Sequence, residues 1–294
     1  MIYPNIECYY LCEWMLNVSR QKLTGTQAAL TTIIQTAALN STSVTEAQWN
    51  NFNLFAAWRN PYYLVYRDYQ YTQASNLLTS LLSYYDFEGN SNDQVSSLNG
   101  TDNAVTYSIS YGKIGQGVSN NSTASSIYFG TNSTYNFIHQ TGIFAVNVWV
   151  KLNTSSGNFR FFCTSASSAQ RGFHSLTSFA GYTQSIIYNP SIASTQAVYS
   201  VVTSLFNDLN WHMYTITGDG SYFYIYLDAV LRLKVPYLTF SAGNSQFPFY
   251  IFNLGGGGGS QNFFIDELGI WSRNLNLAEI AKLYNSGAGL TYPF

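Results

Sequence analysis

The sequence predicts a mainly β protein, a two-sheet antiparallel jelly-roll sandwich preceded by a small helical module. From about residue 82 onward, short runs of alternating apolar and polar residues are separated by Gly, Asn, Ser and Asp, as in antiparallel strands joined by turns. No helical spacing separates these runs, and a stretch of roughly 210 residues suits one large jelly roll better than two small domains. The first 80 residues have the apolar spacing of helices. We therefore expect two domains, residues 1–80 and residues 81–294.

Three features place helix starts within residues 1–80. Capping boxes occur at residues 24–27 (TGTQ) and 43–46 (SVTE), and Asn60 with Pro61 supplies an N-cap followed by a proline at the first helical position. The helices are amphipathic and rich in bulky aromatics. Two interpretations stay open: a small bundle that buries its own core, or an attachment and oligomerisation module whose aromatic faces dock on a partner.

The alternating runs locate the strands of the sandwich. In chain order they are TYSIS, SSIYFG, IFAVNVWVKL, NFRFFCTS, HMYTITG, SYFYIYLDAVLRL, FPFYIFNL and FFIDELGIWS. A short helix is expected near the end of the chain, in the segment NLAEIAKLYNSG, with Asn276 as its N-cap and Gly287 at its end.

Charge is scarce in this chain. Only 9% of the 294 residues are charged, the net charge is −2, and polarity comes from Asn, Ser, Thr, Gln and the tyrosine hydroxyls. Twelve scattered Lys and Arg cannot form the phosphate-binding patch that nucleic acid requires, so no nucleic-acid partner is expected. The composition is unlike that of a disordered chain and suits a rigid, weakly charged extracellular or particle surface.

Membrane insertion and export are not expected. No apolar run reaches the roughly 18 residues of a membrane span. The start of the chain lacks a basic n-region and carries Glu7 and Glu13, unlike a signal peptide. The three cysteines, Cys8, Cys12 and Cys163, are too few for a disulfide framework and lack the further ligands of a metal site, so they are interpreted as small buried thiols.

The run LGGGGGS (residues 254–260) allows three interpretations: a spacer between domains, a phosphate-binding loop, or a turn within one domain. A phosphate loop needs Lys followed by Ser or Thr and then a helix, whereas Ser260 leads into a strand pattern. A spacer needs a domain on each side, and the residues after Ser260 are too few for one. We therefore predict a hairpin connection at residues 255–259, between strands in 247–254 and 263–271.

Five segments of the second part resemble, in order, the concanavalin A-like jelly rolls related to laminin G domains. They are LLSYYDFEGNSNDQVSSLNGT (81–101), YGKIGQGVSN (111–120), FAVNVWVKLN (144–153), NWHMYTITGDGSYFYIYLDAVL (210–231) and FFIDELGIWSRNLNLAEIAKLYN (263–285). They are similar to the family's opening strand and loop, its glycine-lysine turn, its central strand with a buried Trp, its Trp-His hairpin, and its closing strand and helix. The resemblance covers residues 82–290 and departs at Ala229, where the family usually has glycine after the hairpin Asp.

The Asn/Ser/Thr/Tyr-rich composition and the closing GLTYPF are similar to tailed-phage structural proteins. This resemblance implies a non-enzymatic virion surface protein, a head or tail fibre or a capsid decoration subunit, made in the host cytoplasm. It implies that residues 1–80 attach to other virion proteins and form a homo-oligomer, a trimer, while the sandwich faces outward, with a cell-surface glycan as a further partner. The alternatives are a carbohydrate-binding adhesin module of a cell surface and a glycoside hydrolase.

Catalysis is not expected, and no catalytic residue is assigned. The three histidines are dispersed and no G-x-S-x-G elbow occurs. A glycosidase needs two carboxylates that face one cleft. Asp86 and Glu88 share a strand face without a third acid, and the adjacent Asp266 and Glu267 are expected to point to opposite faces.

These acidic residues suit calcium binding better than catalysis, because Ca²⁺ prefers carboxylates and backbone carbonyls from loops. In the resembling family the N-terminal loop and the closing strand lie together. Glu88, Asp93 and Asp266 are therefore the candidate ligands of a structural Ca²⁺, with Asn90 beside them. The alternative is that these side chains make turn hydrogen bonds, and no cofactor is required.

A sugar site would use an aromatic platform with Asn or Asp as hydrogen-bond partners. Tyr182, Tyr188 and Tyr237 are the candidates, because we expect them on loops. Aromatics on strands belong more often to the core.

Overall fold

The computed structural model describes residues 76–155, 157–165, 171–178, 182–189, 194–200, 208–236, 242–255 and 259–294. The chain divides into two units, residues 1–75 and residues 76–294, and the second unit forms a sandwich. The helical module predicted over residues 1–80 lies outside the described residues, apart from residues 76–80, which belong to the second unit. None of the described helices has the length and apolar character that a membrane span requires.

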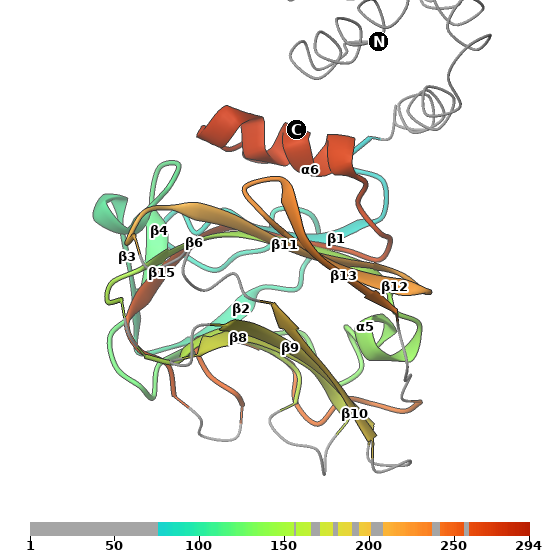
Figure 1. The fold of residues 1–294 in the computed structure, drawn as a ribbon. Helices are drawn as coiled ribbons and strands as arrows, with labels where there is room; N and C mark the ends of the chain where they lie inside the picture. Colours follow the sequence, from blue (N-terminus) through green and yellow to red (C-terminus); the bar gives the residue numbers. More distant parts are fainter. Residues whose placement is uncertain are drawn as a thin grey trace, which may run out of the picture. The chain divides into compact units, whose positions relative to one another are not determined.

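The first sheet of the sandwich contains eight antiparallel strands of the described residues (Figure 1). In spatial order they are β13 (Val230–Pro236), β12 (Tyr222–Leu227), β11 (His212–Asp219), β6 (Ile143–Leu152), β15 (Phe263–Trp271), β4 (Gly117–Asn120) and β3 (Val105–Ser108), with β1 (Leu81–Tyr85) also paired to β15. The short strands β4 and β1 pair with the first and second halves of β15, so together they line one edge of that strand.

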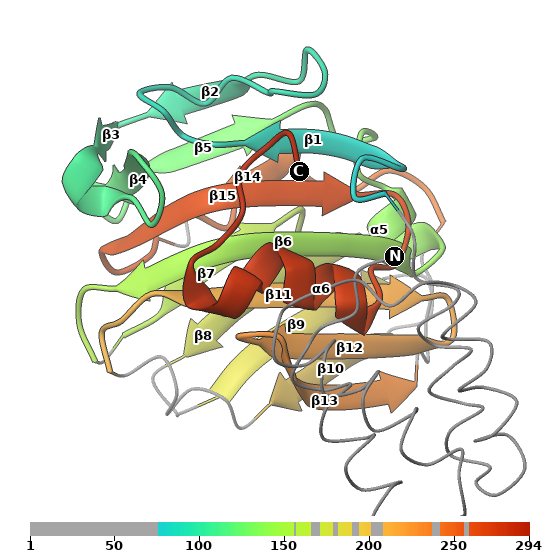
Figure 2. The same cartoon turned by 90° about the horizontal axis from the view of Figure 1, so that it is seen from above.

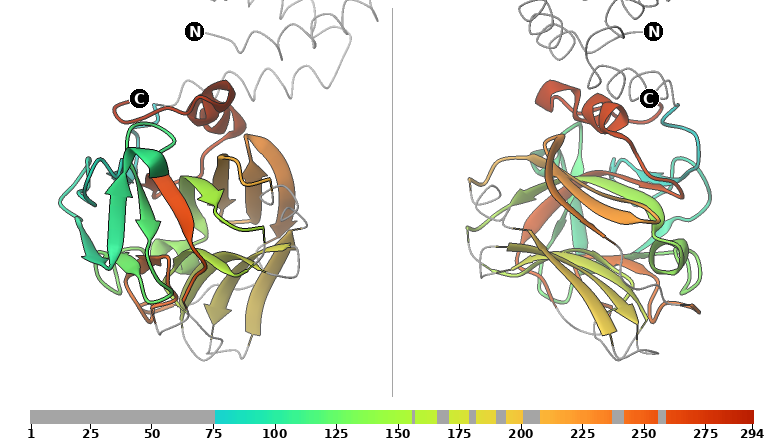
Figure 3. Two further views of the ribbon diagram at one scale, coloured as in Figure 1. Left: turned by 90° about the vertical axis from the view of Figure 1, so that its left-hand side faces the viewer. Right: turned by 45° about the vertical axis from the view of Figure 1, so that its right-hand side comes forward.

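The second sheet contains seven antiparallel strands of the described residues and lies face to face with the first (Figure 3). In spatial order they are β10 (Ser194–Ser200), β9 (Tyr182–Asn189), β8 (Gly172–Ser178), β7 (Phe159–Cys163), β14 (Phe249–Ile251), β5 (Ser126–Phe129) and β2 (Gly100–Asn103). Strands β7 to β10 and β11 to β13 each form a meander, whereas the chain crosses between sheets from β5 to β6 and from β14 to β15. A short helix, α5 (Phe137–Gln140), precedes β6, and a 3-10 turn, η1 (Ile109–Tyr111), follows β3.

Aromatic and branched side chains from the facing surfaces of the two sheets form the main core. Phe162 of β7 stacks on Phe249 of β14 with ring centroids 5.4 Å apart, and Phe144 of β6 meets Phe173 of β8 edge to face at 5.7 Å. Strand β6 is buried along almost its whole length, on alternate sides. Its apolar–polar alternation is weak because the first sheet is covered on both faces.

A second apolar cluster, the helix core, covers the outer face of the first sheet. Helix α6 (Leu277–Tyr284) runs across β6 and β11 on this face (Figures 1 and 2). Ile280 and Leu283 of α6 pack there with Trp149 of β6, Met213 of β11 and Trp271 of β15. The first sheet is therefore the middle layer of three.

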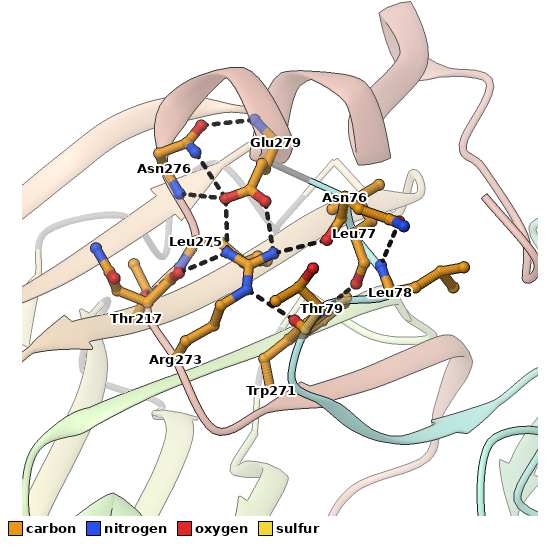
Figure 4. A network of polar contacts seen from close by, with 11 residues as sticks. Asn76, Leu77, Leu78, Thr79, Thr217, Trp271, Arg273, Leu275, Asn276 and Glu279 are labelled. Atoms are coloured by element: carbon orange, nitrogen blue, oxygen red, sulfur yellow. Dashed lines mark hydrogen bonds and ion pairs between the residues drawn. The ribbon is translucent and has the colours of Figure 1, made fainter. Parts of the chain in front are cut away.

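An ion pair between Arg273 and Glu279 fastens α6 to this face (Figure 4). The Glu279 side chain is only 3% exposed, and its two oxygens lie 2.5 and 2.9 Å from the Arg273 Nη atoms. Glu279 also completes a capping box with Asn276, whose side chain accepts from the Glu279 N–H at 2.9 Å. Arg273 donates further to the carbonyls of Asn76 and Thr79, so one guanidinium joins the start of the sandwich, the end of β15 and the start of α6.

Most of the expected strands occur where the alternating runs lie, and the cap of the last helix is confirmed at Asn276. Two expectations need correction. The run TYSIS forms a strand only as far as Ser108, because the 3-10 turn η1 follows it. Strands β8, β9 and β10 were not predicted, since their Ser-, Thr- and Gln-rich sequences lack a clear apolar alternation.

The glycine run lies within the sandwich unit, as predicted, and an antiparallel bridge joins Asn253 to Gly259 across it. The strands that it connects, β14 and β15, are however not paired with each other in a hairpin. Strand β14 belongs to the second sheet and β15 to the first, so the run crosses between sheets. Gly255 has φ +73°, and a Cβ at Gly259 would lie 2.2 Å from the carbonyl oxygen of Thr123. Left-handed backbone and close backbone approach are the two conditions that require glycine.

The hairpin between β12 and β13 keeps its tight turn despite Ala229. Asp228 and Ala229 both have positive φ, +53° and +60°, as a two-residue turn of this hand requires. The Asp228 carboxylate accepts from the Met213 N–H at 2.9 Å and lies 2.7 Å from His212 Nδ1. His212 Nε2 lies 2.9 Å from Asp208, so both ring nitrogens of this histidine have a carboxylate neighbour within the chain.

Breaking the Arg273–Glu279 pair should destabilise the sandwich. We expect Glu279→Gln to lower the free energy of unfolding by about 3 kcal/mol, because it leaves the guanidinium without its buried partner. Urea denaturation measures this effect. Lys282→Gln, on the exposed side of α6, is the control and should change stability by less than about 0.5 kcal/mol. A double-mutant cycle of Arg273→Met with Glu279→Gln that gave no coupling energy would contradict this role.

Candidate functional site

Asp266, the central acid of the predicted Ca²⁺ site, is fully buried and is surrounded by backbone donors. Its Oδ2 accepts from the N–H groups of Lys113 and Ile114 at 2.7 and 2.9 Å, and its Oδ1 accepts from the Glu267 N–H at 2.9 Å. Burial raises the pKa of Asp266 well above its usual value, with a further contribution from Glu267, while the three N–H groups act in the opposite direction. The carboxylate thus ties the turn before β4 to β15.

The other two predicted Ca²⁺ ligands also accept backbone hydrogen bonds. Glu88 Oε1 accepts from the Gln116 N–H at 2.9 Å. Asp93 Oδ1 accepts from the N–H groups of Tyr84 and Val95 at 2.9 and 3.0 Å. In the part of the chain that the structure describes, no three His, Cys, Asp or Glu side chains are arranged to hold a metal ion. Calcium binding stays a prediction without a described set of ligands.

Asp266 and Glu267 lie on the same face of the first sheet, so the prediction of opposite faces is wrong. Asp266 pairs with Trp149, whose side chain packs under α6. A β-bulge follows, in which Glu267 has φ +52°, and the Glu267 carboxylate accepts a hydrogen bond from the Tyr84 hydroxyl. Simple alternation fails at a bulge because one extra residue enters the strand.

The last residues of the chain pack beside this acid pair. The Tyr84 ring lies 5.8 Å from the ring of Tyr292 and 5.2 Å from that of Phe294, and its hydroxyl is 3.2 Å from the Leu290 carbonyl. Glu267 is 2% exposed. Both carboxylates of the pair are thus buried against other parts of the chain.

The tyrosines predicted as a sugar platform are not on loops where the structure describes them. Tyr182 is the first residue of β9, and Tyr188 lies within the same strand, paired with Gly172 and Thr195. Tyr237 lies outside the described residues. Their role in sugar binding stays a prediction.

A different group of aromatics gathers on the outer face of the second sheet. Tyr128 of β5 and Tyr250 of β14 are direct cross-strand partners, with ring centroids 5.3 Å apart. Both point outward because their strand neighbours point into the main core. Phe247, just before β14, lies 6.3 Å from Tyr250. We call Tyr128, Tyr250 and Phe247 the tyrosine platform; all three side chains are partly exposed.

Polar side chains from two loops border the tyrosine platform. The loop after β5 and the loop before β14 are joined by hydrogen bonds: Asn132 Nδ2 donates to the Gln246 carbonyl at 2.9 Å, and Asn136 Nδ2 donates to Asn244 Oδ1 at 2.9 Å. The buried Ser245 connects the same loops through its N–H and hydroxyl. Asn132, Asn244 and Gln246 are exposed and form what we call the amide rim.

Two buried histidines near this face, His174 and His139, have pKa values that burial and a neighbouring arginine lower. His174 pairs with Cys163, which in turn pairs with Tyr250. Burial lowers the pKa of His174 to about 4, and the charge of Arg160 adds to the effect. Burial also lowers the pKa of His139, and Arg171 adds to it. Both imidazoles are therefore neutral at pH 7.

The tyrosines on the outer face of the first sheet have different surroundings. The Lys234 ammonium lies 4.1 Å from the centroid of the Tyr222 ring and 5.3 Å from that of Tyr224. The Tyr224 hydroxyl donates to Asp219 at 2.8 Å. These rings and their polar groups already have partners within the chain. Among the described residues, the tyrosine platform with its amide rim is the arrangement better suited to a ligand that is apolar on one face and hydroxylated at its edge.

The sequence contains an indication that Tyr128 and Tyr250 lie on the outer face of the sheet. In SSIYFG and FPFYIF, Tyr128 and Tyr250 fall out of phase with the apolar residues on either side, which places them on the outer face. Their pairing depends on the register of β5 with β14, strands separated by more than a hundred residues. That register is a property of the tertiary fold.

Glu267→Gln should reduce the pH dependence of stability. Burial raises the pKa of Glu267 from 4.5 to about 7, with Asp86 and Glu88 adding to the shift, so the folded state binds the proton more tightly than the unfolded chain. The resulting stabilisation is complete below pH 4.5 and is lost as the pH rises through about 7. We expect thermal melts to show a decline across this interval that is weaker in Glu267→Gln. The exposed Asp102→Asn, a carboxylate that does not contribute to the shift of Glu267, should keep the decline; parallel profiles for wild type and Glu267→Gln would refute the assignment.

Comparison with known proteins agrees with this architecture. No curated protein sequence matches the chain. The sequence model of the family described as "Concanavalin A-like lectin/glucanases superfamily" matches residues 116–281. Among solved structures, the binding domain of Paraclostridial Mosquitocidal Protein 1 is 15% identical with a TM-score of 0.55, over 72% of this chain and 53% of that one. The botulinum neurotoxin serotype D binding domain is 13% identical with a TM-score of 0.53, over 71% of this chain and 51% of that one.

A third structure is similar over nearly its whole length. Domain 4 of AbnA, a GH43 extracellular arabinanase from Geobacillus stearothermophilus, was solved in complex with arabinotriose; it is 16% identical with a TM-score of 0.55, over 69% of this chain and 97% of that one. The present chain spans about half the length of the two toxin binding domains. At these identities the three structures show a shared fold. Because the family's sequence model covers more than half of the 294 residues, the chain belongs to the concanavalin A-like lectin/glucanase superfamily.

Proposed function

We propose that this chain is a non-enzymatic surface protein that binds glycans through the tyrosine platform and the amide rim. The platform supports the proposal because a pyranose or furanose ring has an apolar C–H face that packs on aromatic rings. Tyr128 and Tyr250 are cross-strand neighbours on adjacent strands, and the opposite face of these strands packs in the main core. A rigid platform loses little conformational entropy when a ligand binds.

The amide rim supplies the second requirement of a sugar site. Asn132, Asn244 and Gln246 offer both donors and acceptors, which suits hydroxyl groups that do both. The hydrogen bonds between the two loops hold the rim in place beside Phe247. The complex of AbnA domain 4 with arabinotriose shows that a sandwich of this fold can bind a sugar. At 16% identity that complex does not place the site in this chain.

Removing one platform ring should weaken glycan binding. We expect Tyr250→Ala in the full-length chain to reduce affinity at least tenfold for whichever glycan the wild type binds on a glycan array, a loss of about 1.4 kcal/mol. Calorimetry with that glycan measures the change. Tyr222→Ala, on the first sheet, is the matched control and should bind like wild type. Unchanged affinity in Tyr250→Ala and Tyr128→Ala would contradict this site, and release of shorter sugars would favour the glycoside hydrolase alternative.

The wider proposal is a virion role, as a head or tail fibre or a capsid decoration subunit. In this role residues 1–80 attach to other virion proteins and hold the chain as a trimer, with the sandwich outward. The low charge and the wealth of amide and hydroxyl side chains support a particle surface. Trimerisation suits a shallow site, because linked sites can gain roughly 10²–10⁴ in avidity without any new contact.

Light scattering and micrographs test this wider role. We expect the full-length chain to have the mass of a trimer, and deletion of residues 1–75, which keeps the whole sandwich unit, to give a folded monomer. Antibodies against the sandwich should label the outside of phage particles in electron micrographs. A full-length monomer at high concentration would contradict the oligomer, and labelling of cell envelopes instead of particles would favour the adhesin alternative.

A further inference from the structure

Arg171 lies immediately before β8, and its carbonyl and the glycine that follows it have close contacts within the fold. Its carbonyl accepts from the Gln246 N–H at 2.9 Å. The next residue, Gly172, has φ +138°, and a Cβ there would lie 2.6 Å from Thr164 Oγ1. The Arg171 side chain therefore starts from a well-defined position beside the loop that carries the amide rim and Phe247.

The guanidinium of Arg171 follows this loop but has no partner in it. A Cβ on Gly243 would lie 3.4 Å from Arg171 Nη1, which puts the guanidinium against the loop backbone. Among the described residues, Arg171 makes no ion pair and no side-chain hydrogen bond, and its Nε is buried without an acceptor. Burial of the Arg171 Nε–H is unfavourable in the free protein, because the hydrogen bond that this group would make to water is not replaced by one within the chain.

The loop beside Arg171 connects it to the tyrosine platform: the guanidinium lies against Gly243, at one end of the loop, and Phe247 lies at the other end. The Arg171 carbonyl is bound by Gln246, Phe247 follows Gln246 in the chain, and the Phe247 ring lies 6.3 Å from that of Tyr250. Arg160 lies on the same sheet, where its charge acts on His174. In a chain with only twelve Lys and Arg, the surroundings of the platform thus contain two arginines.

We infer that Arg171 binds the anionic group of an acidic glycan whose sugar ring packs on the tyrosine platform. A guanidinium matches the geometry of an oxyanion and binds it through two parallel N–H donors. The chemistry is shared by sugar carboxylates, as in uronic and sialic acids, and by sugar sulfates. The inference rests on the proposed function and adds to it the charge class of the glycan.

A glycan array of matched structures tests this inference in the full-length chain. Each neutral glycan is printed beside its carboxylated and sulfated derivatives. We expect the wild type to prefer an acidic member at least tenfold over its neutral parent, and 0.5 M NaCl to reduce that preference by screening. The better of the carboxylated and sulfated members identifies the anion.

Variants of Arg171 then separate recognition from structure. Arg171→Gln should lose the preference for the acidic member while keeping its affinity for the neutral parent, and Arg171→Lys should keep part of the preference because it retains charge without the paired donors. Arg232→Gln, an exposed arginine on β13 of the first sheet, is the control with the same change in charge and should bind like wild type. The melting temperature of Arg171→Gln should be unchanged or higher, since the variant removes a cation without a partner; a lower one would indicate a structural role.

Two results would overturn the inference in different ways. Equal binding of neutral and acidic members, or a preference that survives Arg171→Gln, refutes the role of Arg171 but leaves glycan binding at the platform intact. Binding to no glycan on the array refutes the proposed function together with the inference.

Discussion

The Arg273–Glu279 ion pair holds α6 against the first sheet, and the burial of the outer face of that sheet under the helix depends on it. Glu279 serves the capping box of the helix and the guanidinium at the same time. Because α6 is fixed there, Trp149 and Trp271 are buried on the outer side of a sheet that also carries the main core on its inner side. The outer face of the first sheet is thereby occupied by the chain itself.

The same face holds the buried acids that resemble a functional cluster. Asp266 and Glu267 are surrounded by backbone N–H groups, the Tyr84 hydroxyl and the end of the chain, so each polar group has a partner inside the fold. Burying carboxylates is costly, and the raised pKa of Glu267, to about 7, reflects that cost. The acids join β15 to the turn before β4 and to β1, a structural use of residues that suggested calcium from sequence.

The second sheet carries the features that a ligand can use. Its outward tyrosines are supported by the main core, and its rim comes from loops that the chain brings together across more than a hundred residues. Arg171 contributes a guanidinium whose buried Nε has no acceptor among the described residues. The outer face of the first sheet is packed against α6, while the proposed ligand site lies on the outer face of the second sheet.

The sequence by itself determined the mainly β class, the capping box at Asn276, and the inclusion of the glycine run within one domain, because alternation, caps and glycine requirements are local properties. The tertiary structure decided the rest. Only cross-strand register pairs Tyr128 with Tyr250, only a bulge turns Glu267 to the face of Asp266, and only the crossing from β14 to β15 shows that the glycine run joins two sheets. These features depend on contacts between distant segments, and no period within a short segment encodes which distant strand will lie beside it.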